Sequence, residues 1–250
     1  MRYTFGFILF FVTLTSFGQV NEVDSQGRKQ GPWMKVYEGT RVFQYKGQFK
    51  NDKPVGKFSY FYKTGKLKAI IEHTAGSNRS VGYYYHAKGG LMSYGIYRNL
   101  KKDSIWTTFD RFGKVSGKET YKNDSLHGQK VIYFPPDEES RNQVVSSVSN
   151  YVNGSLEGDY IEYFINRSVR EKGTYKNNKK HGVWISYQVG GAKMMLTRYK
   201  EGKRHGWCLA YDKLGKEQAK KYFYYGRHLE GKELAKKMKQ MKELGIHPNE

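Results

Sequence analysis

Three histidines occupy the same place in a phrase that returns along the chain. His127, His181 and His205 each directly precede a glycine, which we call the anchor glycine. Imidazole is a common metal ligand, so such a ladder suggests metal binding. Equivalent residues in adjacent two-stranded units would lie about 9–10 Å apart, whereas two histidines on one zinc need nitrogens within roughly 4 Å. We therefore expect these histidines in turns, with no metal or other cofactor. A ladder that charges at mildly acidic pH would strengthen binding to an anionic surface.

Aromatic residues recur two positions after the anchor glycine and form the candidate binding surface. Large rings supply contact area, and nearby lysines supply positive charge. Side chains alternate between the two faces of a strand, so the same rings could instead form the buried face, and both alternatives stay open at this point. The candidate binding residues are Trp33, Phe58, Tyr84, Trp106, Tyr160 and Trp184.

We find no arrangement of residues that indicates catalysis, and we predict no catalytic residue. Cys208 is the only cysteine, so the chain forms no internal disulfide, and we expect a small buried side chain there. The acidic run Asp137-Glu138-Glu139 reads as a solvated loop. A hydrolase acting on glycan or cell wall, with carboxylates from different repeats, is the least favoured alternative, because a thin sheet seldom provides a pocket.

These residues are positioned by an internal repeat. Anchor glycines recur from Gly31 to Gly231 in eight steps, which is a mean period of 25 residues, and Ser104 replaces one of them. A fixed period of this length indicates a repeat architecture, which builds long binding surfaces. The step from Gly128 to Gly158 is longer, and we place an enlarged loop over residues 135–143. The anchors are Gly31, Gly56, Gly82, Ser104, Gly128, Gly158, Gly182, Gly206 and Gly231.

Each repeat is predicted to be one β-hairpin. Residues alternate after the anchor, a second glycine such as Gly113 or Gly215 follows nine positions later, and an aromatic such as Tyr175 comes at position 17. Asn-rich pairs such as Asn177-Asn178 then turn the chain. No single hairpin is stable alone. We therefore predict an all-β fold, an elongated single-layer antiparallel β-meander over residues 19–231, with a slightly irregular hairpin after Gly82.

Phrases such as Asn177-Asn178-Lys179-Lys180-His181-Gly182 and Gly182-Val183-Trp184-Ile185-Ser186-Tyr187 resemble the MORN repeat, most closely its YwqK-like bacterial variant. The resemblance covers roughly residues 27–231. It implies stacked β-hairpins and a scaffold or a protein- or lipid-contact module. It also implies a second candidate function, since YwqK-like proteins are often described as antitoxins that neutralise a toxin. The resemblance supplies no catalytic residues.

The two ends of the chain differ from the repeats. Residues 1–18 combine Arg2, an apolar stretch and small residues, which is typical of a secretory signal peptide that is removed. An uncut membrane anchor is the alternative. Residues 232–250 form a basic helix and tail in which Leu234, Met238 and Met241 share a face. We expect this helix to cap the last hairpin, and the alternative is binding to an anionic membrane.

Charge defines the expected partners. The chain has 44 Lys and Arg against 23 Asp and Glu, a formal net charge of +21. Together these features predict an exported, non-enzymatic binding or scaffold protein that is periplasmic, associated with the outer envelope, or secreted. Its partner would be a protein or an anionic envelope component, either a lipid headgroup or a glycan. Nucleic acid is disfavoured outside the cell.

Overall fold

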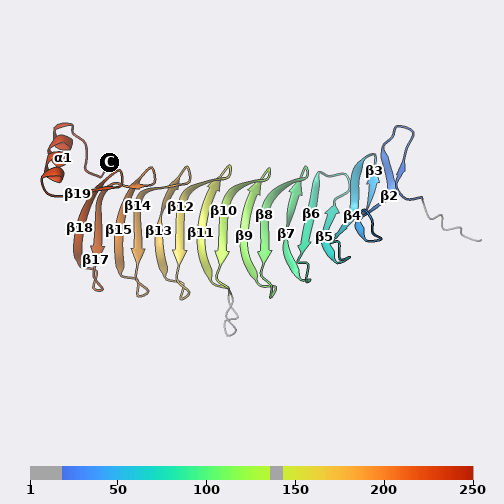
Figure 1. Ribbon diagram of the computed structural model, residues 1–250, viewed down its shortest axis with the longest axis horizontal. Coiled ribbons are helices and arrows are strands. Elements are labelled where there is room, and N and C mark those ends of the chain that lie inside the picture. Colours follow the sequence, from blue (N-terminus) through green and yellow to red (C-terminus); the bar gives the residue numbers. More distant parts are fainter. Residues whose placement is uncertain (1–18, 136–142, 250) are drawn as a thin grey trace, which may run out of the picture.

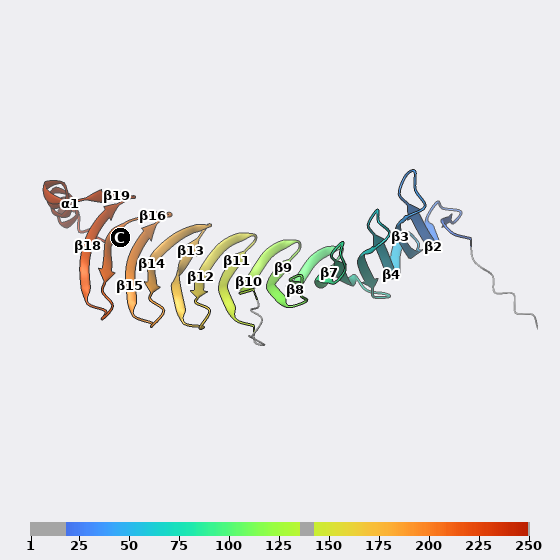
Figure 2. The same ribbon diagram turned by 60° about the horizontal axis from the view of Figure 1, so that its bottom comes forward.

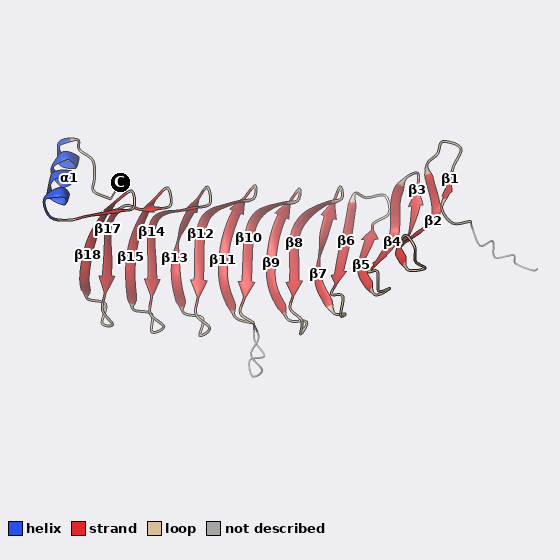
Figure 3. Cartoon of the chain, in the orientation of Figure 1, coloured by secondary structure: helices blue, strands red, loops and turns tan. Residues whose placement is uncertain are grey.

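The computed structural model describes residues 19–135 and 143–249. They form one long, open antiparallel sheet with a single helix at its C-terminal end (Figure 1). Consecutive strands pair with each other, except that β15 pairs with both β16 and β17, so the sheet is a meander of consecutive hairpins (Figure 3). The predicted fold class is therefore confirmed. The signal-peptide prediction for residues 1–18, and residues 136–142 of the predicted enlarged loop, lie outside the described residues.

The described segments contain 19 strands and one helix. The elements are β1 (Glu22–Val23), β2 (Lys29–Val36), β3 (Phe43–Lys50), β4 (Lys53–Phe61), β5 (Leu67–His73), β6 (Arg79–Tyr85), β7 (Leu91–Arg98), β8 (Lys101–Phe109), β9 (Val115–Lys122), β10 (Ser125–Tyr133), β11 (Val145–Val152), β12 (Ser155–Tyr163), β13 (Val169–Lys176), β14 (Lys179–Tyr187), β15 (Lys193–Lys200), β16 (Lys203–Arg204), β17 (Gly206–Tyr211), β18 (Glu217–Tyr224), β19 (Arg227–Leu229) and α1 (Gly231–Glu243).

The anchor glycine lies inside the first strand of most hairpins, where the pairing register shifts. In β14, Lys172 of β13 pairs with Ile185 and Thr174 pairs with His181, so residues 182–184 oppose only one residue. Such a bulge bends the strand and requires positive φ. Gly182 has a φ of 66° and Ser104 a φ of 60°, so the serine adopts the conformation of the glycine it replaces. Figure 2 shows the resulting curvature of the strands.

Two kinds of turn join the strands, as the sequence predicts. Most described hairpin tips carry a glycine with positive φ, for example Gly113 at 77° and Gly215 at 81°, and the tip between β12 and β13 carries Arg167 at 69° instead. The turn between hairpins has two residues, such as Asn177 at 49° and Asn178 at 64°. Asn is among the residues that tolerate this left-handed conformation best. From β7 to β18 the turns between hairpins follow the upper edge of the sheet in Figure 1, and the tips follow the lower edge.

The core is a ladder of aromatic rings that runs along one face of the curved sheet. Rings two positions after the anchor alternate with rings near position 17, and neighbours meet edge to face. Tyr175 lies 5.0 Å from Trp184 between ring centroids, with an interplanar angle of 85°. Tyr97 and Trp106 are likewise 5.0 Å apart at 80°. Such ring contacts, together with that of Phe49 with Phe58, connect one hairpin to the next at three places.

The third repeat departs from this pattern more than its sequence suggests. Gly82 is the one anchor without positive φ, and β5 pairs with β6 without a register shift. Residues 74–78 replace the usual two-residue turn before it. Position 17 of the preceding repeat holds His73 instead of a benzene or phenol ring. The third repeat therefore has no bulge at its anchor, and the ladder holds an imidazole ring at position 17.

Helix α1 caps the last strands, as predicted from its apolar face. Met241 is 3% exposed and packs with Tyr222 and Leu229, while Leu234 and Met238 contact the edge of the same cluster. The apolar face is thus occupied by the sheet, which favours the capping alternative over a membrane-bound helix. In the described part of the chain, no helix is long and apolar enough to cross a membrane.

Candidate binding surface

The structure corrects part of the candidate binding surface predicted from the sequence. Phe58, Trp106 and Trp184 are only 2%, 3% and 2% exposed, so these rings are core residues. Trp33, Tyr84 and Tyr160 are half-buried in the same ladder. The reason is the bulge at the anchor, which folds the ring at the second following position over the strand before it. The aromatic face is therefore the buried face, and an exposed site must lie elsewhere.

Lysines two positions before the anchor cover the ladder from the solvent side. The Nζ of Lys180 lies 3.7 Å from the ring centroid of Trp184 and 5.6 Å from that of Tyr199. Lys29 and Lys102 sit in the same way over their own pairs of rings. The alkyl stem covers apolar surface, and the ammonium gains a cation–π attraction. These lysines thus serve packing as well as charge, and sequence reasoning missed this position.

Two lysines near the ladder form ion pairs with acidic side chains of the neighbouring strand. Lys180 pairs with Glu171 at 3.0 Å, and Lys130 pairs with Glu119 at 2.8 Å. Glu119 also accepts a hydrogen bond of 2.8 Å from the Tyr121 hydroxyl. Burial, followed by this bond, raises the pKa of Tyr121 to about 12. Burial opposes ionisation of Glu119, but its bonds from Lys130 and Tyr121 hold its pKa below the usual value.

Basic residues follow the edge formed by the turns between hairpins. At four of these turns the residues on either side are both basic and stand directly opposite each other in the antiparallel ladder. We call this set of eight residues the basic rim. It consists of Lys50 opposite Lys53, Arg98 opposite Lys101, Lys176 opposite Lys179, and Lys200 opposite Lys203.

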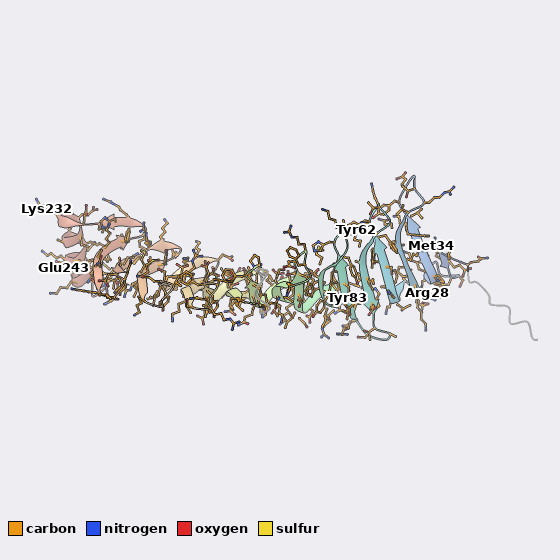
Figure 4. All side chains as sticks on the ribbon, turned by 90° about the horizontal axis from the view of Figure 1, so that it is seen from below. Arg28, Met34, Tyr62, Tyr83, Lys232 and Glu243 are labelled. Carbon is orange, nitrogen blue, oxygen red and sulfur yellow. The ribbon has the colours of Figure 1, made fainter. Side chains whose placement is uncertain are left out.

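Like charges directly across a strand pair repel each other, and their repetition opposes folding. All members of the basic rim except Lys200 are exposed. Arg98 also lies 3.6 Å from Asp103, which offsets part of its charge. Arg79 stands opposite Arg98 on the other side, so three basic residues adjoin across β6, β7 and β8. Figure 4 shows side chains along the whole length of the ribbon, on both of its sides.

The three histidines lie outside the turns, because the two-residue turns come earlier in each repeat; His205 lies between β16 and β17. His127 and His181 belong to β10 and β14, just before the bulge. The Nδ1 of His127 lies 3.3 Å from Oδ1 of Asn153 in the next turn. His205 is 3% exposed and packs edge to face on Tyr225 at 4.5 Å. Across residues 19–135 and 143–249, no group of three or more His, Cys, Asp or Glu side chains could hold a metal ion.

The basic rim could have been found from the sequence, since basic residues flank the turn in phrases such as Lys176-Asn177-Asn178-Lys179. Sequence reasoning assigned many turn lysines to a general solvated surface instead. Comparison of the chain with protein-family models and with curated proteins found no match.

Proposed function

We propose that this chain is an exported, non-enzymatic binding or scaffold protein, built from MORN-like repeats, that holds an anionic partner along the basic rim. The observation that carries the proposal is the four like-charged pairs, which cost folding energy at the same place in four hairpins. A feature that opposes stability and recurs is best explained by binding. Export is supported by the signal-peptide pattern of residues 1–18.

The spacing of the rim suits an extended partner. Each hairpin adds two strands to the sheet, so successive turns stand roughly 9–10 Å apart. The four turns of the rim are separated by two, three and one hairpins, so the rim extends over roughly 50–60 Å of the sheet. A linear polyanion or an acidic polypeptide can span such distances, whereas a small ion meets only one turn. Because seven of the eight rim residues are exposed, the attraction is screened by salt and falls as ionic strength rises.

Replacement of four rim lysines by glutamine tests the proposal. The variant carries Lys50→Gln, Lys53→Gln, Lys176→Gln and Lys179→Gln. We expect its affinity for heparin, polyglutamate or phosphatidylglycerol vesicles to fall roughly tenfold or more, with a weaker dependence on salt. We also expect its unfolding temperature to rise, because two like-charged pairs are removed.

The matched control removes the same charge from the hairpin tips, through Lys63→Gln, Lys66→Gln, Lys213→Gln and Lys216→Gln. These residues are exposed and lie at the other edge of the sheet. If the tip variant loses as much affinity as the rim variant, binding reflects net charge alone, and the proposal fails.

A further inference from the structure

One turn of the rim carries a residue that does not belong in a turn. Leu100 follows Asn99 between β7 and β8, is 69% exposed, and has a φ of 61°. For a bulky residue this left-handed conformation is a clear outlier that costs energy. Equivalent turns place a small or polar residue there. They hold Asp52, Asp124, Gly154, Asn178, Gly202 and Gly226.

Leu100 forms one wall of a pocket in the irregular third repeat. The inner pocket has a volume of about 340 Å³ and an apolar floor that includes Phe58, Ile71 and Tyr97. His73 and Ser80 line it as well, and their polar atoms satisfy each other through a contact of 2.8 Å between Ser80 Oγ and His73 Nδ1. The floor therefore offers mainly apolar contact to a ligand.

This pocket is open because no lysine side chain covers the rings of this repeat. In three repeats a lysine two positions before the anchor, Lys29, Lys102 or Lys180, lies over the rings, but here the same positions hold Pro54 and Ser80. Ser80 is 3% exposed and is too short to cover a ring. The place that a lysine side chain fills elsewhere is open, and Leu100 lies at its edge.

The mouth of the pocket is polar and basic. The inner pocket continues into an outer hollow of about 650 Å³, lined by Lys53, Asn78 and Asn99 among others. Leu100 is itself flanked by Arg98 and Lys101 of the basic rim. A partner bound along the rim therefore crosses the pocket, and the amide side chains can bond to a polypeptide backbone.

From this arrangement we infer that the pocket takes one large apolar side chain of an acidic polypeptide that lies along the basic rim. The inference rests on the proposed function and adds the class of partner. An acidic glycan or a lipid headgroup brings charge but no apolar group of this size. Hydrophobic anchors in a pocket, surrounded by charge, are the usual organisation of a protein interface.

Synthetic peptides and the full chain test the inference. The first peptide is a short run of Asp and Glu with one central phenylalanine, and the second has alanine in its place. We expect the phenylalanine peptide to bind the protein roughly tenfold or more tightly, from burial of the ring. Leu100→Asn should reduce that affinity to the level of the alanine peptide and leave the alanine peptide unchanged. Leu100→Gly should act in the same way.

Both substitutions relieve the strained conformation, so loss of binding cannot come from unfolding. Leu214→Asn is the control, because Leu214 is 94% exposed at a hairpin tip and should leave both affinities unchanged. Equal affinities of the two peptides for the wild type, or full affinity of Leu100→Asn, would overturn the inference and leave the proposed function intact. Binding of heparin without either peptide would do the same. No salt-dependent binding of any of these probes would overturn both.

Discussion

Gly173 lies directly beneath the indole ring of Trp184, and a β-carbon added to the glycine would overlap the ring carbons. The same relationship joins Gly47 to Phe58 and Gly95 to Trp106. In all three pairs the glycine precedes the ring by eleven residues. The glycine is the single residue that faces the bulge of the next strand, so the bend and the absent side chain together make room for the ring.

Gly173→Ala should therefore destabilise the fold even though alanine suits a strand no worse than glycine. The added methyl group must push the indole out of the ladder or move the backbone, and overpacking of this kind costs about 1–3 kcal/mol. Urea unfolding followed by tryptophan fluorescence measures the loss. Gly190→Ala is the control, because Gly190 has open space around it and a φ outside the positive region, so it should be close to neutral. Equal effects of the two substitutions would contradict the packing relationship.

A reciprocal exchange at two anchors tests the role of the bulge. Ser104 holds the left-handed conformation that Gly182 adopts at the equivalent place. Ser104→Gly should stabilise the protein by up to about 1 kcal/mol, and Gly182→Ser should destabilise it by about 1–2 kcal/mol. The serine hydroxyl donates a 2.9 Å bond to Asp103, whose loss offsets part of the gain. Thermal unfolding of both variants gives the comparison, and effects of the same sign would show that backbone conformation does not decide stability there.

The C-terminal helix should protect only the strands that it covers. Met241→Ala removes the most buried side chain of α1 from its contact with Tyr222 and should cost about 2–4 kcal/mol locally. In a repeat protein, interactions are mainly between neighbours, so the effect should fade along the sheet. Hydrogen exchange should increase in β17 to β19 and stay unchanged in β7 to β9. Lys239→Ala, on the exposed side of the helix, is the control. Faster exchange throughout the sheet would refute local capping.

The sequence alone predicts the β-meander, because the same turn residues recur along the chain. Positive φ at Gly113 and Gly215, and at both members of Asn177-Asn178, confirms the two predicted kinds of turn. Even the substitution of Ser104 for glycine was placed correctly. A period that is reinforced many times defines pairing between neighbouring repeat units, and the described strands pair in this way.

The face of the sheet that is buried could not be predicted from alternation alone. Trp184 and Val183 are adjacent apolar residues, and a period of two cannot tell which side is covered when the second layer is missing. The decision depends on the bulge, which turns Trp184 over Gly173 and leaves Val183 44% exposed. The eleven-residue spacing from glycine to ring was the available signal. In the repeat anchored by Gly128, Glu119 and Lys130 occupy the two positions and form an ion pair of 2.8 Å.

The repeat pattern could not predict the pocket either, because the pocket lies in a repeat that departs from the pattern. The sequence marks the third repeat as irregular, and it shows His73 in place of an aromatic ring. It does not show that Gly82 loses its bulge, since the residue itself is unchanged. The longer turn at residues 74–78 accompanies that loss, whereas Leu100 is strained because a bulky residue occupies the left-handed position of a regular two-residue turn.

His73 should make the third repeat sensitive to mild acid. Burial lowers the pKa of His73 from the ordinary value of about 6.5. The unfolded chain therefore binds a proton at a higher pH than the folded chain does. The contribution of His73 to the free energy of unfolding is fully present above about pH 6.5. It falls as the pH drops from there towards the lower pKa of the folded state. The contribution of Glu119 follows a separate course, because its lowered pKa places the loss below its ordinary value of 4.5.

His73→Phe separates these contributions and restores the kind of ring found at this position in other repeats. Phe58 meets the His73 ring edge to face at 5.4 Å, a contact that phenylalanine can keep. The free energy of unfolding, measured in urea between pH 7.5 and pH 5, should decline less steeply in the variant than in the wild type. The slope is the decisive quantity, because the added ring also changes stability at every pH. Parallel slopes for the two proteins would show that His73 binds protons equally in the folded and unfolded states. Its burial would then have no part in the response to acid.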